Sequence, residues 1–68
     1  MPEVILRPDE TWRRCGISRS MLFALVKSGE FPKPIRLTSR TVGFVEREVD
    51  GWIRDRIQQS RGDAADAT

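Results

Sequence analysis

The sequence predicts a single, mainly α-helical domain with a small β-hairpin. One observation behind this is a pair of short segments, residues 8–15 and 19–28, that carry helix start and stop signals and are only three residues apart. Another is the stretch 30–45, where two prolines and two β-branched, apolar runs favour extended chain. A chain of 68 residues has room for one domain with a small core. We expect that domain to span residues 1–60.

The N-terminal segment contains an apolar run and the start of the first helix. Residues 4–6 are Val-Ile-Leu, a run too short to distinguish a strand from a cover over the core. Pro8 suits the first position of a helix, where its missing N–H costs nothing. Asp9 and Glu10 place negative charge at the positive end of the helix dipole. We therefore predict a helix from about Pro8 to Cys15.

The first helix has an inner and an outer side. We place Thr11, Trp12 and Cys15 inside, and Arg13 and Arg14 outside. Two interpretations of Trp12 stay open, burial in the core and exposure to a partner, and burial is favoured because Trp is mostly buried.

The second helix is the segment around which the chain is organised. Ser18 can cap the free N–H groups of its first turn, and Gly29 can take the left-handed conformation that ends a helix. Spacings of three and four residues place an apolar set on the core face, consisting of Ile17, Leu22, Leu25 and Val26. An outward set remains, consisting of Arg19, Ser20, Met21, Ala24 and Lys27. Such a face can bind phosphates and base edges, although solvated residues of this kind are also common.

The connection between the two helices predicts how they are arranged. Only Gly16 and Ile17 separate the first helix from the Ser18 cap. The helices must therefore meet at a steep angle, as in a helix-turn-helix.

The segment after Gly29 predicts a two-stranded wing. Pro32 and Pro34 forbid a helix and leave Phe31 free to enter the core. Residues 35–37 and 42–45 are the predicted strands, and residues 38–41 have the length of a hairpin connection. Arg40 falls at the wing tip, so the whole pattern predicts a winged helix-turn-helix.

The last predicted helix runs from about Arg47 to Ser60 and closes the core. Its apolar stripe consists of Val49, Trp52, Ile53 and Ile57. Gly51 weakens this helix by up to ~1 kcal/mol relative to Ala, so either a close contact excludes a side chain there or the cost is tolerated. Residues 61–68 have no apolar anchor, and we expect a disordered C-terminal tail.

The charges are distributed unevenly. Residues 11–40 carry seven cations against one anion, whereas residues 41–68 carry four cations against six anions. A basic region that coincides with an exposed helix is typical of a nucleic-acid binder.

Composition excludes several other classes. One cysteine and no histidine rule out a zinc finger and a disulfide framework, and we expect no metal and no cofactor. Cys15 is most simply a small buried residue of a reducing compartment, and an exposed thiol is the alternative. No apolar run reaches the ~18 residues of a membrane span, so we expect no membrane partner and a cytoplasmic protein.

We also expect no enzyme, because Ser18 and Ser20 lack an activating base. The carboxylates at 46, 48, 50 and 55 read as a solvated helix surface among arginines.

Three motifs in this order resemble the AlpA family of small phage and prophage regulators. They are residues 16–20 (Gly-Ile-Ser-Arg-Ser), residues 29–34 (Gly-Glu-Phe-Pro-Lys-Pro), and Val-Gly-Phe at 42–44 followed by Glu-Val at 48–49 and Trp-Ile at 52–53. The family is similar to excisionases and to the DNA-binding end of MerR-type regulators. The resemblance covers about residues 5–57 and implies sequence-specific binding of double-stranded DNA, either to activate a promoter or to direct an integrase toward excision. Members often carry Tyr-Arg where this chain has Phe23 and Ala24, so base preference is not carried over.

The predicted DNA-binding residues therefore lie on the helix-turn-helix and the wing. They are Arg13, Arg14, Ser18, Arg19, Ser20, Met21, Phe23, Ala24, Lys27, Lys33, Arg36 and Arg40. The expected partners are double-stranded DNA, an integrase, and neighbouring copies of the chain on repeated sites, where the acidic last helix of one copy meets the basic flank of the next. The alternative is a protein-interaction adaptor that binds a partner through Trp12 and the acidic last helix without specific DNA binding.

Overall fold

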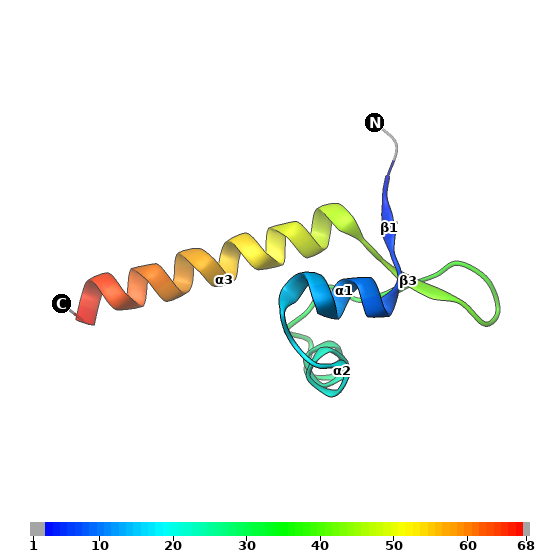
Figure 1. Cartoon of the computed structure of the whole chain (residues 1–68), viewed down its shortest axis with the longest axis horizontal. Coiled ribbons are helices and arrows are strands. Elements are labelled where there is room, and N and C mark those ends of the chain that lie inside the picture. Colours follow the sequence, from blue (N-terminus) through cyan, green and yellow to red (C-terminus); the bar gives the residue numbers. More distant parts are fainter. Residues whose placement is uncertain (1–2, 68) are drawn as a thin grey trace.

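The computed structural model describes residues 3–67, with side chains for residues 3–62. The element order is β1 (Ile5–Leu6), α1 (Pro8–Cys15), α2 (Arg19–Ser28), β2 (Ile35–Arg36), β3 (Val42–Val45) and α3 (Glu46–Ala67). Figure 1 shows α1 lying between α2 and α3, with the wing loop and the free end of α3 pointing in opposite directions. This mainly helical architecture with a small sheet confirms the predicted fold class.

The two short helices begin and end where their capping residues predict. The Ser18 Oγ accepts a hydrogen bond from the Met21 backbone N–H at 3.1 Å, which satisfies one free donor of the first turn of α2. Gly16 follows α1 with φ 72° and Gly29 follows α2 with φ 83°. Both values are in the left-handed region, where glycine has no steric cost.

The sheet has one strand more than the predicted hairpin. Its order is β1-β3-β2, and both pairs are antiparallel, with Ile5 opposite Val45 and Ile35 opposite Gly43. The N-terminal apolar run, for which the sequence left two interpretations open, is therefore a strand. Gly43 lies where the strands approach closely, because a Cβ at this position would collide with the Ile5 side chain and lie 3.1 Å from the Leu6 carbonyl oxygen.

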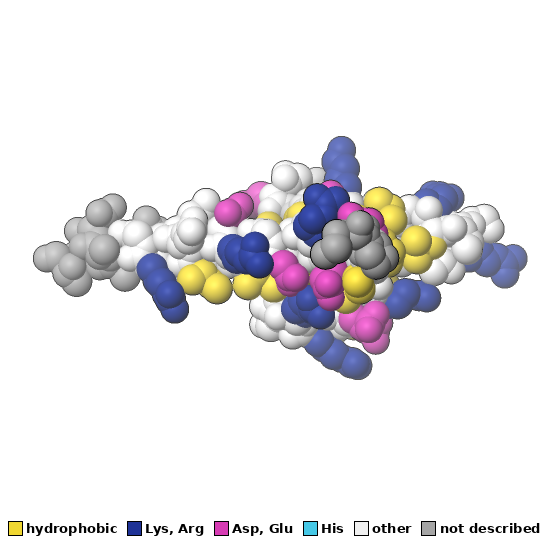
Figure 2. Space-filling view, turned by 90° about the horizontal axis from the view of Figure 1, so that it is seen from above, with side chains coloured by type: hydrophobic (Ala, Val, Ile, Leu, Met, Phe, Trp, Pro, Cys, Tyr) yellow, Lys and Arg dark blue, Asp and Glu magenta, His cyan; other side chains and the backbone are white. Residues whose placement is uncertain are grey.

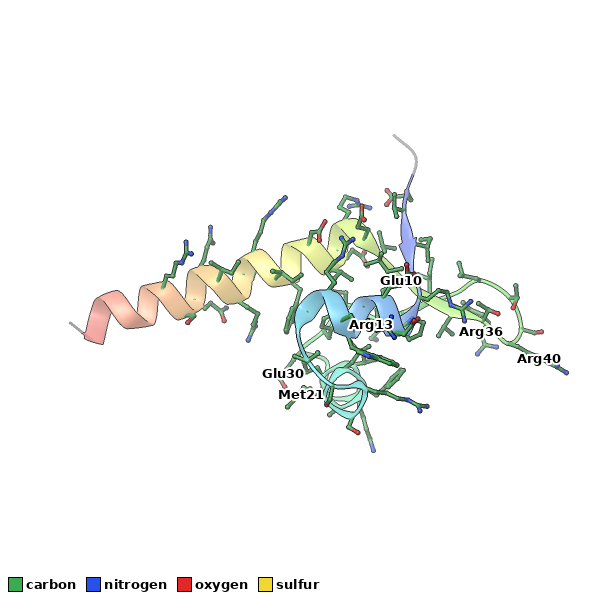
Figure 3. The ribbon with its side chains drawn as sticks, in the orientation of Figure 1. Glu10, Arg13, Met21, Glu30, Arg36 and Arg40 are labelled. Atoms are coloured by element: carbon green, nitrogen blue, oxygen red, sulfur yellow. The ribbon has the colours of Figure 1, made fainter. Side chains whose placement is uncertain are left out.

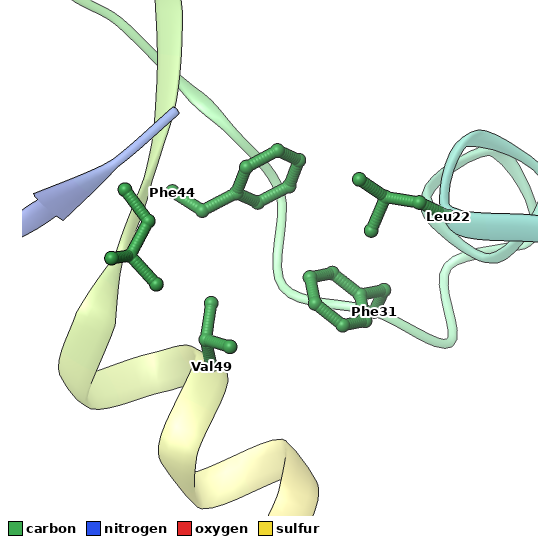
Figure 4. Packing of buried hydrophobic residues seen from close by; sticks show 5 residues of the cluster. Leu22, Phe31, Phe44 and Val49 are labelled. Carbon is green, nitrogen blue, oxygen red and sulfur yellow. The ribbon is translucent and has the colours of Figure 1, made fainter. Parts of the chain in front are cut away.

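The core joins the sheet, the helix-turn-helix and the start of α3. Phe44 on β3 and Leu22 on α2 are fully buried, and Phe31 packs edge-on against Phe44 with ring centroids 5.5 Å apart (Figure 4). Leu6 and Val49 complete the buried cluster. A ring of half-buried residues packs against it, consisting of Trp12, Cys15, Ile17, Leu25, Val26, Trp52 and Ile53. Trp12 is thus a core-flanking residue.

Helix α3 differs most from its prediction. It begins one residue earlier than expected and continues to Ala67, through the segment for which we expected a disordered tail. No proline interrupts residues 61–67, and three of these seven residues are alanines, which have the highest helix propensity. The prediction that Ile57 belongs to the core stripe is wrong. Its side chain is 43% exposed, because α3 has by then left the body of the domain (Figure 1).

The structure also decides between the two explanations of Gly51. A Cβ built there meets no atom within 4 Å, so no close contact inside the chain excludes a side chain. Among residues 3–67, no helix combines the length and the apolar character needed to cross a membrane.

Candidate nucleic-acid interface

The outer face of α2 is the centre of the candidate interface. Leu22 anchors one side of α2 in the core. The residues on the other side of the helix therefore face solvent. Met21 is 50% exposed and Phe23 is 39% exposed. Arg19, Ser20, Ala24 and Lys27 are also exposed, and within the described residues neither cation forms an ion pair. Figure 3 shows Met21 on the side of α2 that points away from α1. The structure therefore brings six of the predicted residues together on one helix.

Ser18 has a structural role at the edge of this face. Its Oγ accepts from the Met21 backbone N–H and so fixes the first turn of α2. The hydroxyl proton is left available to donate to a phosphate oxygen.

The two arginines of α1 have different surroundings. Arg13 is on the surface with its side chain 75% exposed. Its Nη1 lies 3.8 Å from the Asp9 Oδ2. The Arg14 Nη1 lies 3.2 Å from a Glu46 carboxylate oxygen and 3.1 Å from one of Asp50. The hydrogen bond to Asp50 is the main cause that raises the pKa of Arg14. Arg14 therefore joins α1 to the start of α3, and its charge is already matched by protein carboxylates.

The wing presents two more cations. Backbone hydrogen bonds between Thr38 and Thr41 close its loop, and the Arg40 N–H donates to the Thr38 Oγ1 at 3.2 Å. Arg36 and Arg40 are exposed, and Figure 3 shows Arg40 near the far end of the loop. The structure thus holds Arg40 at the tip of an ordered turn, as the sequence predicted.

Lys33 lies just before the first wing strand, β2, and lines a groove that the sequence did not reveal. This groove, here called the Gly51 groove, has a volume of about 630 Å³ and is open to solvent. Its walls are the segment before β2 and one side of α3, with Pro32, Lys33, Pro34, Ile35, Glu48, Gly51, Trp52 and Asp55. The one sequence signal that could have indicated it is Gly51, a helix-weakening residue within an otherwise regular pattern.

The face that carries α3 has charges of both signs. Figure 2 shows acidic side chains over the middle of this face with lysine and arginine side chains among them, and further basic side chains toward its ends and edges. Glu46 and Asp50 of α3 form ion pairs with Arg14. Among the described residues, no ion pair is formed by the cations of α2 and the wing, which are Arg19, Lys27, Arg36 and Arg40. The exposed cations of α2 and of the wing are therefore available for an anionic partner.

Comparison with known proteins assigns the chain to a protein family. Residues 4–57 match the family model described as the prophage CP4-57 regulatory protein AlpA. The chain is also 38% identical over 55 residues to an uncharacterized protein, ORF88, of Enterobacteria phage P4. That alignment covers 81% of this chain and 62% of the phage protein, so the chain spans less than two thirds of that relative's length. No solved structure matches the chain. Since the family model covers most of the chain, from β1 into α3, the protein belongs to the AlpA family of phage regulatory proteins.

Proposed function

We propose that the protein is a sequence-specific DNA-binding regulator of a mobile element. The observation that carries this proposal is the outer face of α2, where Arg19, Ser20 and Met21 stand exposed beside the Ser18 cap. A helix fits the major groove, which is ~12 Å wide, and a helix-turn-helix contacts bases with the first residues of its second helix. Arg19 is then the residue best placed to read a guanine.

The remaining candidate residues act around this contact. Phe23 and Ala24 offer apolar surface to thymine methyl groups, while Ser18, Arg13 and Lys27 bind phosphates. Arg36 and Arg40 reach the minor groove or its phosphates from the wing. Arg14 is left out of this interface because Glu46 and Asp50 already hold it.

Within this function, we infer a role as an excisionase, as a transcriptional regulator, or as both, through cooperative binding to repeated sites. A single winged helix buries only about 600–1,000 Å² on DNA, which gives little genomic specificity. Several copies on adjacent repeats add selectivity, because each raises the local concentration of the next. A coated, bent attachment site is what an integrase needs to bridge distant arms, and a promoter can use the same array.

The test is a gel shift with DNA from the gene's own locus and with random DNA. We expect Arg19→Ala to lower specific affinity by about 1–3 kcal/mol while random binding changes less. Arg47→Ala is the matched control, since it removes the same charge from a 73% exposed side chain at the start of α3, outside the candidate interface. If retention on a heparin column does not depend on salt concentration and the gel shift shows no discrete protein–DNA complex, the protein-interaction adaptor is favoured instead.

A further inference from the structure

The free end of α3 presents a surface that nothing in the described chain covers. Arg54, Ile57 and Arg61 follow one another at spacings of three and four residues, so they share one side of the helix. The Ile57 side chain is 43% exposed. Neither arginine has an acidic side chain within ion-pair distance among the residues that the structure describes. This side of α3 is thus an exposed aliphatic group between two cations.

The Gly51 groove has the opposite pattern. Glu48 and Asp55 lie on its α3 wall, one on either side of Gly51 along the helix, and neither forms an ion pair within residues 3–62. The ring of Trp52 and the 39% exposed side chain of Ile35 supply apolar surface. The groove is thus an apolar depression between two carboxylates.

Gly51 keeps this depression open at a cost to the helix. Glycine within a helix costs about 1 kcal/mol relative to Ala, and no atom lies within 4 Å of where its Cβ would be. Packing inside the chain therefore gives no reason for glycine here. The space that a side chain would take is that of the groove, so the glycine suits the close approach of another molecule.

The spacing of the two surfaces matches. Glu48 and Asp55 are seven residues apart, which is about 10.5 Å along a helix, and Arg54 and Arg61 have the same separation. We propose that the free end of α3 from one copy docks into the Gly51 groove of a neighbouring copy. Ile57 then packs on the apolar wall beside Gly51, and the two arginines pair with the two carboxylates.

This contact is built to extend along DNA. At 100° per residue, Ile57 and Gly51 lie about 120° apart around α3, so the two surfaces are distinct and the contact is head-to-tail. When each copy is related to the next by the same step along repeated DNA sites, such a contact extends as an open row of copies. It is also small, because one short helical segment enters one groove, so it needs DNA to hold the copies side by side.

The inference rests on the proposed binding to repeated sites and names the surfaces that join the copies. It also replaces part of the earlier expectation: the acidic side of α3 stays one half of the contact, but its partner is the basic free end of the next α3 and not the basic flank of the next helix-turn-helix. Glu46 and Asp50 are already bound to Arg14, which leaves Glu48 and Asp55 as the available acids between residues 46 and 62 of α3, where the structure describes side chains.

The test compares binding to DNA with one, two and three repeats. For the natural sequence we expect the second site to bind about 5- to 150-fold more tightly than the first, the usual range of coupling between sites. Arg54→Gln combined with Arg61→Gln should reduce this factor to near one and leave single-repeat binding close to its control. That control is Gln59→Glu with Ser60→Glu, which changes the net charge by the same two units on other sides of α3.

Gly51 offers a variant that separates docking from folding. Gly51→Gln should raise the melting temperature, because it improves helix propensity in open space, and should still remove cooperativity by filling the groove. A variant with all four charges reversed has Glu48→Arg and Asp55→Arg together with Arg54→Glu and Arg61→Glu. It keeps the net charge and the complementarity of the two ion pairs, so it should bind cooperatively, as we expect of the natural protein and not of the Arg54→Gln, Arg61→Gln variant.

Each outcome has a defined meaning. Cooperativity that survives the Arg54→Gln, Arg61→Gln and the Gly51→Gln variants overturns the docking contact while leaving the proposed function intact. A stable dimer in sedimentation without DNA overturns it as well, since the proposed contact is too small to hold two copies together without DNA. Failure of the natural protein to bind a single repeat specifically would instead refute the proposed function.

Discussion

Trp52 connects the segment after α2 to the last helix, and its replacement tests how α3 is packed. Its ring lies 4.9 Å from that of Phe31, centroid to centroid, at an angle of 56°. Its Nε1 donates to the Glu30 carbonyl oxygen at 2.8 Å. The guanidinium of Arg56 lies over the indole ring, 5.3 Å from its centroid. Trp52 thus ties α3 to the residues that lead from α2 to the wing.

These contacts give the magnitude of the expected effect. Removal of a large aromatic ring from a core costs about 3–5 kcal/mol, and the half-buried position of Trp52 places it at the lower end. Loss of the Nε1 hydrogen bond adds about 0.5–1 kcal/mol, because Glu30 is exposed and water replaces the donor. Trp52→Ala should therefore lower the free energy of unfolding by about 3–4 kcal/mol. A domain of this size has a total stability of about 3–10 kcal/mol, so much of the protein would unfold.

Urea denaturation followed by far-UV circular dichroism measures this change without depending on tryptophan fluorescence. Trp52→Phe should cost about 1–2 kcal/mol, because an aromatic ring still packs on Phe31 but donates no hydrogen bond. Ile57→Ala is the control on the same helix, and we expect a change within about 0.5 kcal/mol because that side chain lies outside the core. A Trp52→Ala protein that unfolds cooperatively at the natural urea midpoint would refute the packing of α3 described above.

Three further predictions follow from single positions. Arg40→Ala should flatten the slope of log K against log salt by about one unit, as expected for a lost phosphate contact, and an unchanged slope in salt-dependent gel shifts would remove the wing from the interface. Gly43→Ala should destabilise the fold by about 1–3 kcal/mol in thermal or urea unfolding, because the added methyl group collides with Ile5 beside the Leu6 carbonyl; a neutral result would contradict the close strand approach. Burial raises the pKa of the Cys15 thiol, so the unfolded chain loses its thiol proton first as pH rises, and stability should fall above the ordinary thiol pKa. Cys15→Ser should remove that alkaline decline, which urea midpoints between pH 7 and 10 would show.

The signals that correctly predicted the helix-turn-helix are local in sequence. Ser18 and Gly29 act on backbone groups within four residues of themselves, and Gly16 takes a conformation that other residues rarely adopt. The core residues of α2 follow from the helical period for the same reason. These features depend on neighbouring residues and need no knowledge of the rest of the fold.

The third strand and the fate of the two α1 arginines were decided by tertiary structure. Ile5 pairs with Val45 across forty residues, and a run of three apolar residues does not specify such a partner. Arg13 and Arg14 are adjacent and chemically identical, yet only Arg14 faces Glu46 and Asp50, because α3 crosses that side of α1. Which cations stay available to DNA is therefore a property of the packed domain.

The same distinction explains Ile57 and the Gly51 groove. The helical period correctly places Ile57 next to Ile53 on one stripe, but it carries no information on where the body of the domain ends beneath that stripe. The groove likewise exists only because the proline-containing segment before β2 lies beside α3. The sequence by itself determined the two short helices, their caps and the excess of cations in residues 11–40, since these depend on short-range hydrogen bonds and composition. Tertiary structure alone decided which side chains those elements cover, because burial depends on contacts between residues far apart in the chain.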